Sequence, residues 1–155
     1  MNIRILSTPQ EKIRASQMGD WWLFNDDTYV VHVLETLTPE AQLAVAIHEL
    51  VEAVLCRKHG VREDQVCSFD EHYEAERQEG KHAEDDEPGD HSLAPYRKEH
   101  QDATFVERAV CHALGISWPM LWRLVPHSGE DRPKTPSPAP AQPEWSEPPP
   151  QHVLD

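Results

Sequence analysis

Apolar residues near the N-terminus are spaced as in short β-strands. Ile-Arg-Ile-Leu occupies positions 3–6, and Asp-Trp-Trp-Leu-Phe occupies positions 20–24. A third segment at 29–34, Tyr-Val-Val-His-Val-Leu, is rich in β-branched residues, which fit a pleated, half-buried surface. The Asn-Asp-Asp-Thr stretch at 25–28 is typical of a hairpin turn. We therefore expect a small antiparallel β-sheet in this part of the chain.

The pattern changes to a helical period over residues 39–59. Thr38 is a good N-cap, Pro39 suits the first helical position, and Gly60 is typical of a helix end. One face of this helix carries Leu43, Ile47, Leu50, Val51 and Val54. The adjoining flank carries Ala41, Val45, His48, Glu52 and Cys56. A polar pair beside small side chains on an otherwise apolar helix indicates a site rather than a solvated face.

The next part of the chain is acidic and is followed by another helix. In the acidic segment 61–94 we expect a short helix in the first half and a loop in the second. The further helix opens at Pro95-Tyr96 and closes at Gly115. Its apolar face consists of Ala103, Val106, Ala109, Val110, Ala113 and Leu114. A neighbouring stripe consists of His100, Thr104, Glu107 and Cys111.

These elements predict one α+β domain over residues 1–125, with the small sheet packed on two or three helices. Residues 126–155 are mostly Ser, Pro, Glu and Gln with few apolar residues. Such a segment buries too little apolar surface to offset the entropy lost on ordering. We therefore expect a disordered, Pro-rich tail.

The charge balance excludes several partners. The chain has 14 Lys and Arg against 28 Asp and Glu, a formal net charge of −14. Nucleic acids and anionic membranes attract basic proteins, so neither is expected as a partner. The apolar run at the N-terminus is too short for a signal peptide, and no apolar stretch is long enough to span a bilayer. Because the 3 cysteines also contain no CxxC pair, we expect a cytoplasmic protein.

The central chemical motif is His48-Glu-Leu-Val-Glu52, in the middle of the first helix. Side chains at i and i+4 lie one above the other, so His48 and Glu52 could bind one ion through nitrogen and oxygen, which suits zinc. Glu49 would lie beside a metal-bound water and could accept its proton as the catalytic base. This is the logic of the H-E-x-x-H helix of metalloproteases, with glutamate replacing the second histidine.

A third metal ligand is expected from the second helix. His100 begins its polar stripe, and an antiparallel neighbour could bring it to His48. Glu107 is a candidate supporting partner for a ligand histidine, and Thr104 of the same stripe is a second supporting residue. Glu99 is the alternative third ligand. The other histidines considered are His72, His82 and His91, expected at the surface, and His59, expected as a helix C-terminal cation.

A β-hairpin that leads into a helix bearing His48 and Glu49 resembles the minimal core of zincin-like metallopeptidases over residues 3–59. The resemblance implies a zinc-dependent peptidase. It also implies that the strand at 29–34 binds an extended peptide or protein substrate by β-addition. The sequence departs from the family at Glu52, where the family motif has histidine.

Two further segments, Ala-Ile-His-Glu-Leu-Val-Glu-Ala at 46–53 and Ala-Pro-Tyr-Arg-Lys-Glu-His at 94–100, resemble an uncharacterised family encoded by phages and prophages. This resemblance implies a phage origin and the host cytoplasm as location, and it supplies no mechanism. The acidic charge and the exposed aromatic candidates also favour a non-catalytic alternative, a small acidic phage protein that binds and blocks a host factor. The acidic loop at 84–90 would be its binding surface.

Other interpretations of the motif are also open. Glu49 and Glu52 resemble half of the Mg²⁺ site of all-helical nucleotide pyrophosphohydrolases, in which two helices supply carboxylates. Alternatively, His48 and Glu52 form a satisfied polar pair at the edge of a core. Cys56 and Cys111, on the same stripes as the candidate ligands, fit small buried packing residues.

Overall fold

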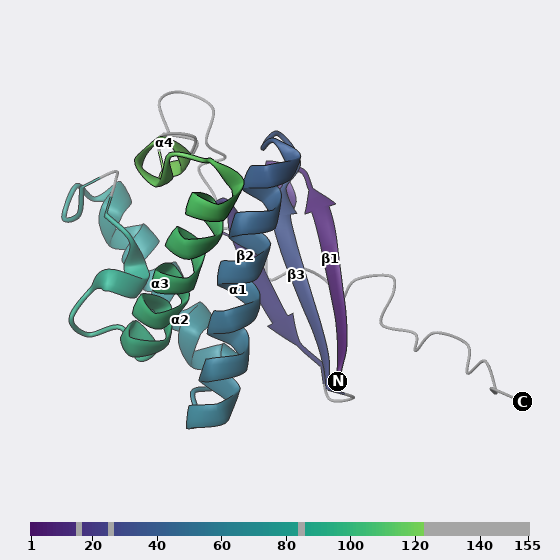
Figure 1. Cartoon of the computed structure of the whole chain (residues 1–155). Helices are drawn as coiled ribbons and strands as arrows, with labels where there is room; N and C mark the ends of the chain where they lie inside the picture. The colour runs from purple at the N-terminus through teal and green to yellow at the C-terminus, as the bar shows by residue number, and fades with distance from the viewer. Residues whose placement is uncertain (15–16, 25–26, 84–85, 123–155) are drawn as a thin grey trace, which may run out of the picture.

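The computed structural model describes residues 1–14, 17–24, 27–83 and 86–122. Its architecture is α+β, as expected, with a sheet made of β1 (Asn2–Thr8), β2 (Gly19–Leu23) and β3 (Thr28–Leu34). The strand order is β1-β3-β2, and β3 pairs antiparallel with β2 and parallel with β1 (Figure 1). The antiparallel expectation therefore holds for β2 and β3 but not for β1. β3 lies between β1 and β2, which run in opposite directions, so it can be antiparallel to only one of them.

The helices follow the sheet in the chain. They are α1 (Pro39–His59), α2 (Glu63–Gln78), α3 (Arg97–Leu114) and the short α4 (Trp118–Trp122), with 3-10 turns η1 (Gln10–Lys12) and η2 (Pro88–Asp90). The Thr38 hydroxyl caps α1 by accepting a hydrogen bond from the Ala41 N–H. α1 ends at Gly60 and α3 at Gly115, with φ angles of 78° and 71° that favour glycine. The helix expected early in the acidic segment is α2.

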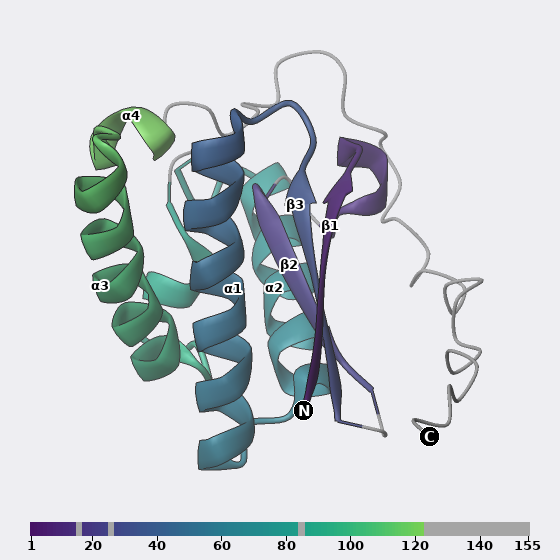
Figure 2. The ribbon, with the colours of Figure 1, turned by 45° about the vertical axis from the view of Figure 1, so that its right-hand side comes forward.

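α1 forms the middle layer of the molecule, with the sheet on one side and α3 on the other (Figure 2). Small side chains on α1 let its neighbours approach closely. These buried residues include Ala41, Ala44, Ala46 and Ala53. At Gly19 of β2, a Cβ atom would lie 2.6 Å from the Val45 side chain and 2.7 Å from that of Glu49. Glycine is therefore needed for β2 to lie this close to α1.

The apolar core lies between the sheet and α1. Tyr29, Val31 and Val33 alternate along β3 and are at most 3% exposed. Trp21 of β2 is the cross-strand partner of Val31, so both side chains point to the same side of the sheet. That side faces α1, because the Trp21 indole reaches Glu52.

α1 and α3 bury only in part the stripes that carry most of their apolar residues. Leu43 is 45% exposed, whereas His48 and Glu52 on the neighbouring flank are each 5% exposed. On α3, Leu114 of the apolar stripe is 38% exposed. The buried residues of α3 are Glu99, His100, Ala103, Glu107 and Cys111. Hydrophobic spacing alone would bury the apolar stripes fully. The two helices instead pack chiefly through the neighbouring flanks, which carry small and polar residues.

Two expectations concern the rest of the chain. Within the described ranges, no helix is long and apolar enough to cross a bilayer. The predicted domain boundary at residue 125 and the predicted disordered tail at 126–155 lie outside the described residues, as do positions 25 and 26 of the predicted turn.

Candidate metal centre

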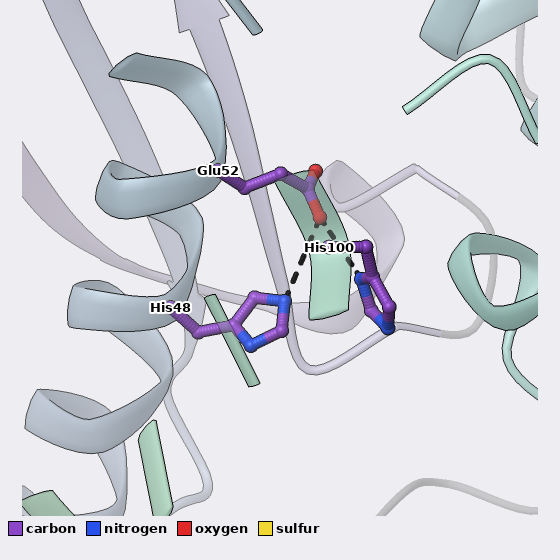
Figure 3. A group of neighbouring side chains, drawn as sticks. All are labelled: His48, Glu52 and His100. Atoms are coloured by element: carbon purple, nitrogen blue, oxygen red, sulfur yellow. Dashed lines mark hydrogen bonds and ion pairs between the residues drawn. The ribbon is translucent and has the colours of Figure 1, made fainter. Parts of the chain in front are cut away.

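The three side chains predicted as metal ligands lie together between α1 and α3. His48 and Glu52 project from successive turns of α1, and His100 projects from the first turn of α3 (Figure 3). Each residue is 5% exposed, and their ligand atoms lie within 4.8 Å of one another. Glu52 Oε2 lies 2.9 Å from His100 Nδ1 and 3.6 Å from His48 Nε2. These separations suit one ion, since zinc holds such ligands at about 2.0–2.2 Å.

Hydrogen bonds orient the carboxylates on both sides of His48. The Trp21 indole N–H donates to Glu52 Oε1 at 2.8 Å, and the second oxygen of Glu52 faces the two histidines. On the other side of the His48 ring, Glu107 Oε2 lies 3.6 Å from Nδ1 and accepts a hydrogen bond from Trp118 Nε1 at 3.0 Å. A carboxylate behind the ring is the usual means of fixing the tautomer and orientation of a ligand histidine.

The cluster concentrates negative charge away from water. Burial alone would raise the pKa of Glu52, but hydrogen bonds from His100 and His48 lower it to about 2. Burial also disfavours a charged His48, yet the carboxylates of Glu107 and Glu52 raise the pKa of this imidazole well above its usual value. In the metal-free protein these carboxylates therefore favour a protonated His48. A cation bound at the same place would replace that proton.

A cavity of about 50 Å³ adjoins the cluster and has room for water or an ion. Glu49 lines this cavity beside His48 and Glu52 and is partly buried. Burial raises the pKa of the Glu49 carboxyl well above its usual value, against the opposing effect of His48 and with the support of the Glu52 charge. The site thus holds a carboxyl group that can exchange protons beside the candidate ligands.

Asp70 and Glu87, which the sequence did not single out, also line the cavity, as does Asp20 of β2. Burial raises the pKa of Asp70 to about 7, although the Tyr96 hydroxyl donates a hydrogen bond to this carboxylate and opposes the shift. Burial also raises the pKa of Glu87 to about 7, against the opposing effect of His100. Both residues lie in the acidic segment, where sequence alone does not distinguish a residue of the site from a solvated one.

Trp21 and Gly89 are further members of the site that sequence reasoning missed. Strand alternation shows that only one of Trp21 and Trp22 can face inward, but it does not indicate which one. Gly89 is buried in η2, and a Cβ atom there would lie 2.3 Å from Cγ of His100. The glycine therefore lets η2 close against the imidazole ring. A lone glycine in an acidic loop gives no sequence signal of such a contact.

Other candidate residues are engaged elsewhere. Glu99, the alternative third ligand, is buried but pairs with His59, with Oε1 2.7 Å from Nδ1. Thr104, expected to support the ligands, is half-buried one turn after His100 and is not among the residues that line the cavity. Cys56 and Cys111 are free thiols with 0% exposure, as expected for packing residues.

The three histidines expected at the surface differ from one another. The side chain of His72 is 72% exposed. His82 instead stacks on Tyr73 with ring centroids 3.8 Å apart and lies 3.1 Å from a Glu76 oxygen. His91 also contacts Tyr73, with 5.6 Å between centroids. The surface prediction is wrong for His82, because the segment after α2 folds back onto that helix.

The donor set fits a metal ion better than a satisfied polar pair. Two imidazole nitrogens and one carboxylate oxygen, with space for water beside them, are the ligands typical of catalytic zinc sites.

Protein-family models, curated proteins and solved structures gave no match to this chain. The zincin-like core and the phage-encoded family inferred from the sequence therefore stay predictions.

Proposed function

We propose that this protein is a metal-dependent hydrolase whose ion, zinc by the chemistry of its donors, is bound by His48, Glu52 and His100. One observation carries the proposal: three buried ligand atoms from two helices lie within 4.8 Å of one another beside a cavity. A buried set of ionisable side chains is costly for folding unless a partner compensates it. A divalent cation is the partner that this donor set fits.

The remaining side chains have distinct roles in this proposal. A zinc ion held by His48, Glu52 and His100 would supply a Lewis acid for water or for a substrate carbonyl. Glu49 accepts the proton of the attacking water and passes it to the leaving group, which is the work of a general base and acid. Glu107 holds His48 from behind with Nε2 toward Glu52.

Peptides or proteins are the proposed substrates, but the predicted β-addition to residues 29–34 is wrong. β3 is the central strand and is already paired on both sides. The outer edge of β2, beside the site, is also occupied. The Trp21 N–H donates to Asp20, and the Trp21 carbonyl accepts from Arg14. The Leu23 N–H donates to Glu63. A substrate therefore reaches the cavity without extending the sheet.

The magnesium alternative has less support. All-helical pyrophosphohydrolases hold their ion with carboxylates from two helices, whereas this fold has a three-stranded sheet. In addition, the groups that meet Glu52 from the two helices are the imidazoles of His48 and His100. Nitrogen donors favour zinc over magnesium.

The non-catalytic alternative also loses its proposed surface. Pro88 and Gly89 of the acidic loop are buried, and Glu87 lines the cavity. The middle of the described loop therefore belongs to the candidate metal centre, and only Asp86 and Asp90 of its described residues are exposed.

Cytoplasmic location, in the host cell if the chain is phage-encoded, remains part of the proposal. All three cysteines, Cys56, Cys67 and Cys111, are free thiols. Free thiols fit a reducing compartment.

Metal content tests the proposal directly. Protein purified without a His-tag and dialysed against zinc should retain about one zinc per chain by mass spectrometry, as expected for a single site of this type. His48→Ala should lose the ion. His72→Ala, which removes an exposed imidazole outside the cluster, should retain it. Equal zinc content in the two variants would contradict the site.

Catalysis needs a separate variant. Glu49→Gln should keep zinc but reduce hydrolysis of a peptide library by about 10²- to 10⁴-fold, the usual contribution of a general base. Mass spectrometry of the peptide products provides the measurement. If Glu49→Gln cleaves as fast as the unaltered protein, Glu49 is not the base.

A further inference from the structure

We propose that Trp21 is a positioning residue that restricts Glu52 to binding the metal through one oxygen. This inference rests on the proposed function, because it concerns the coordination of the same ion. Trp21 is 3% exposed, and its indole Nε1 lies 2.8 Å from Glu52 Oε1. The other oxygen, Oε2, is the one that approaches both His100 and His48. The carboxylate is thus divided between an indole and the candidate metal position.

The direction of this hydrogen bond is unambiguous. An indole N–H can only donate, whereas either imidazole nitrogen can donate or accept depending on the tautomer. Glu52 Oε1 is therefore the acceptor whether or not an ion is present. Turning Oε1 toward the metal would leave the buried indole N–H unpaired, which costs about 1–3 kcal/mol. Trp21 consequently favours monodentate over bidentate binding.

Monodentate binding has a consequence for chemistry at the site. One oxygen from Glu52 and one nitrogen from each of His48 and His100 would give a tetrahedral ion three protein ligands. A fourth position would then be open to water on the side of Glu49, which lines the adjoining cavity. A bidentate carboxylate would crowd that position.

β2 also supplies a matched control. Trp22 follows Trp21 along the strand, so it points to the opposite face of the sheet. Its ring lies beneath the Arg14 guanidinium, 3.9 Å from the carbon atom to the ring centroid, and Trp22 does not line the cavity. Trp21→Phe and Trp22→Phe make the same chemical change on one strand, but only the first removes a donor to Glu52.

Cobalt titration tests the inference with a spectroscopic readout. Co²⁺ bound to the unaltered protein should give the intense visible absorption of a tetrahedral ion, and Trp22→Phe should give the same spectrum. In Trp21→Phe, Glu52 is free to bind through both oxygens, so the absorption should weaken as the coordination number rises. Its Co²⁺ affinity should fall by about 10- to 100-fold, as for other partners of metal ligands.

Each outcome distinguishes the inference from the proposed function. If the unaltered protein binds no Co²⁺ or Zn²⁺, both are overturned. If it binds the ion and Trp21→Phe matches Trp22→Phe in spectrum and affinity, the role of Trp21 is overturned while the metal site stands. Should Trp21→Phe fail to fold by circular dichroism, benzothienylalanine at position 21, which keeps the ring shape without the N–H, decides by the same spectrum.

Discussion

At the centre of β3, Val31 and Val33 are 0% and 1% exposed, and between α1 and α3, Glu107 and His48 are 1% and 5% exposed. The two regions are buried to the same degree, but one is apolar and the other ionisable. Apolar burial contributes about 25 cal/mol per Å² to folding, whereas buried charges rarely repay their desolvation. Equal burial therefore has different consequences in the two regions. β3 stabilises the fold, whereas the α1–α3 cluster is the proposed ion site.

The largest expected effect comes from removing one member of the ionisable cluster. Glu52→Ala leaves His48, His100 and the Trp21 indole without their shared partner. Unfolding by urea with EDTA present should show a loss of about 3–5 kcal/mol, the usual result of breaking a buried pair. Val31→Ala, the apolar control, should lower the free energy of unfolding by about 2 kcal/mol, because it removes buried methyl groups and leaves a cavity. A smaller loss for Glu52→Ala than for Val31→Ala would contradict the comparison.

Replacing the whole cluster sharpens the same comparison. A variant with apolar side chains at all four positions leaves no charge unpaired. Its changes are His48→Leu, Glu52→Met, His100→Leu and Glu107→Met. Without metal, it should lose less stability than Glu52→Ala, because apolar replacement of buried charges is often neutral or stabilising. The remaining loss comes from the Trp21 and Trp118 indole N–H groups, which no longer have their acceptors. The variant should bind no zinc. A variant as unstable as Glu52→Ala would mean that the cluster is structural.

A pH-dependent effect follows from Asp70, whose pKa burial raises from 3.8 to about 7. A raised pKa means that the folded state holds the proton more tightly than the unfolded state, so stability falls as pH rises from about 4 to 7. Asp70→Asn does not titrate and still accepts the Tyr96 hydrogen bond. With EDTA present, both proteins should melt alike near pH 4. At pH 8 the variant should be more stable by up to about 4 kcal/mol. A difference that does not change with pH would refute this account of Asp70.

A smaller loss of stability than that of Glu52→Ala is expected at η2. Gly89→Ala places a Cβ atom 2.3 Å from Cγ of His100, so the ring must move. Overpacking of this kind costs about 1–3 kcal/mol, measurable by thermal melting. The free energy of zinc binding should change by more than the free energy of unfolding, because the added Cβ atom displaces the His100 ring from the ligand position. Retained zinc binding would show that His100 is not a ligand.

The sequence predicted the local features of this protein better than its long-range contacts. The N-cap Thr38 and the terminal Gly60 delimit α1 as expected, because capping depends on neighbouring residues. The spacing of His48 and Glu52 also predicted a shared helix face, and His100 was found from its place on the polar stripe of α3. Side chains that approach from other segments, such as Trp21, carry no local signal.

The parallel pairing of β1 and the outward face of Leu43 were missed for a related reason. Strand order depends on how the whole sheet assembles, and helical spacing cannot say which of two flanks a neighbour will cover. In the folded protein, α1 and α3 contact each other through the flanks that carry small and polar residues. This contact brings the candidate ligands His48, Glu52 and His100 together.

X-ray absorption at the zinc edge tests the central claim most directly, because it reports the atoms around the ion in the zinc-loaded protein. We expect about four nitrogen or oxygen neighbours at about 2.0–2.1 Å, with the scattering pattern of two imidazole rings. Loss of one imidazole contribution in His100→Ala would identify that ring. Zinc with no imidazole scattering, or with a sulfur neighbour at about 2.3 Å, would contradict a centre built from His48, Glu52 and His100.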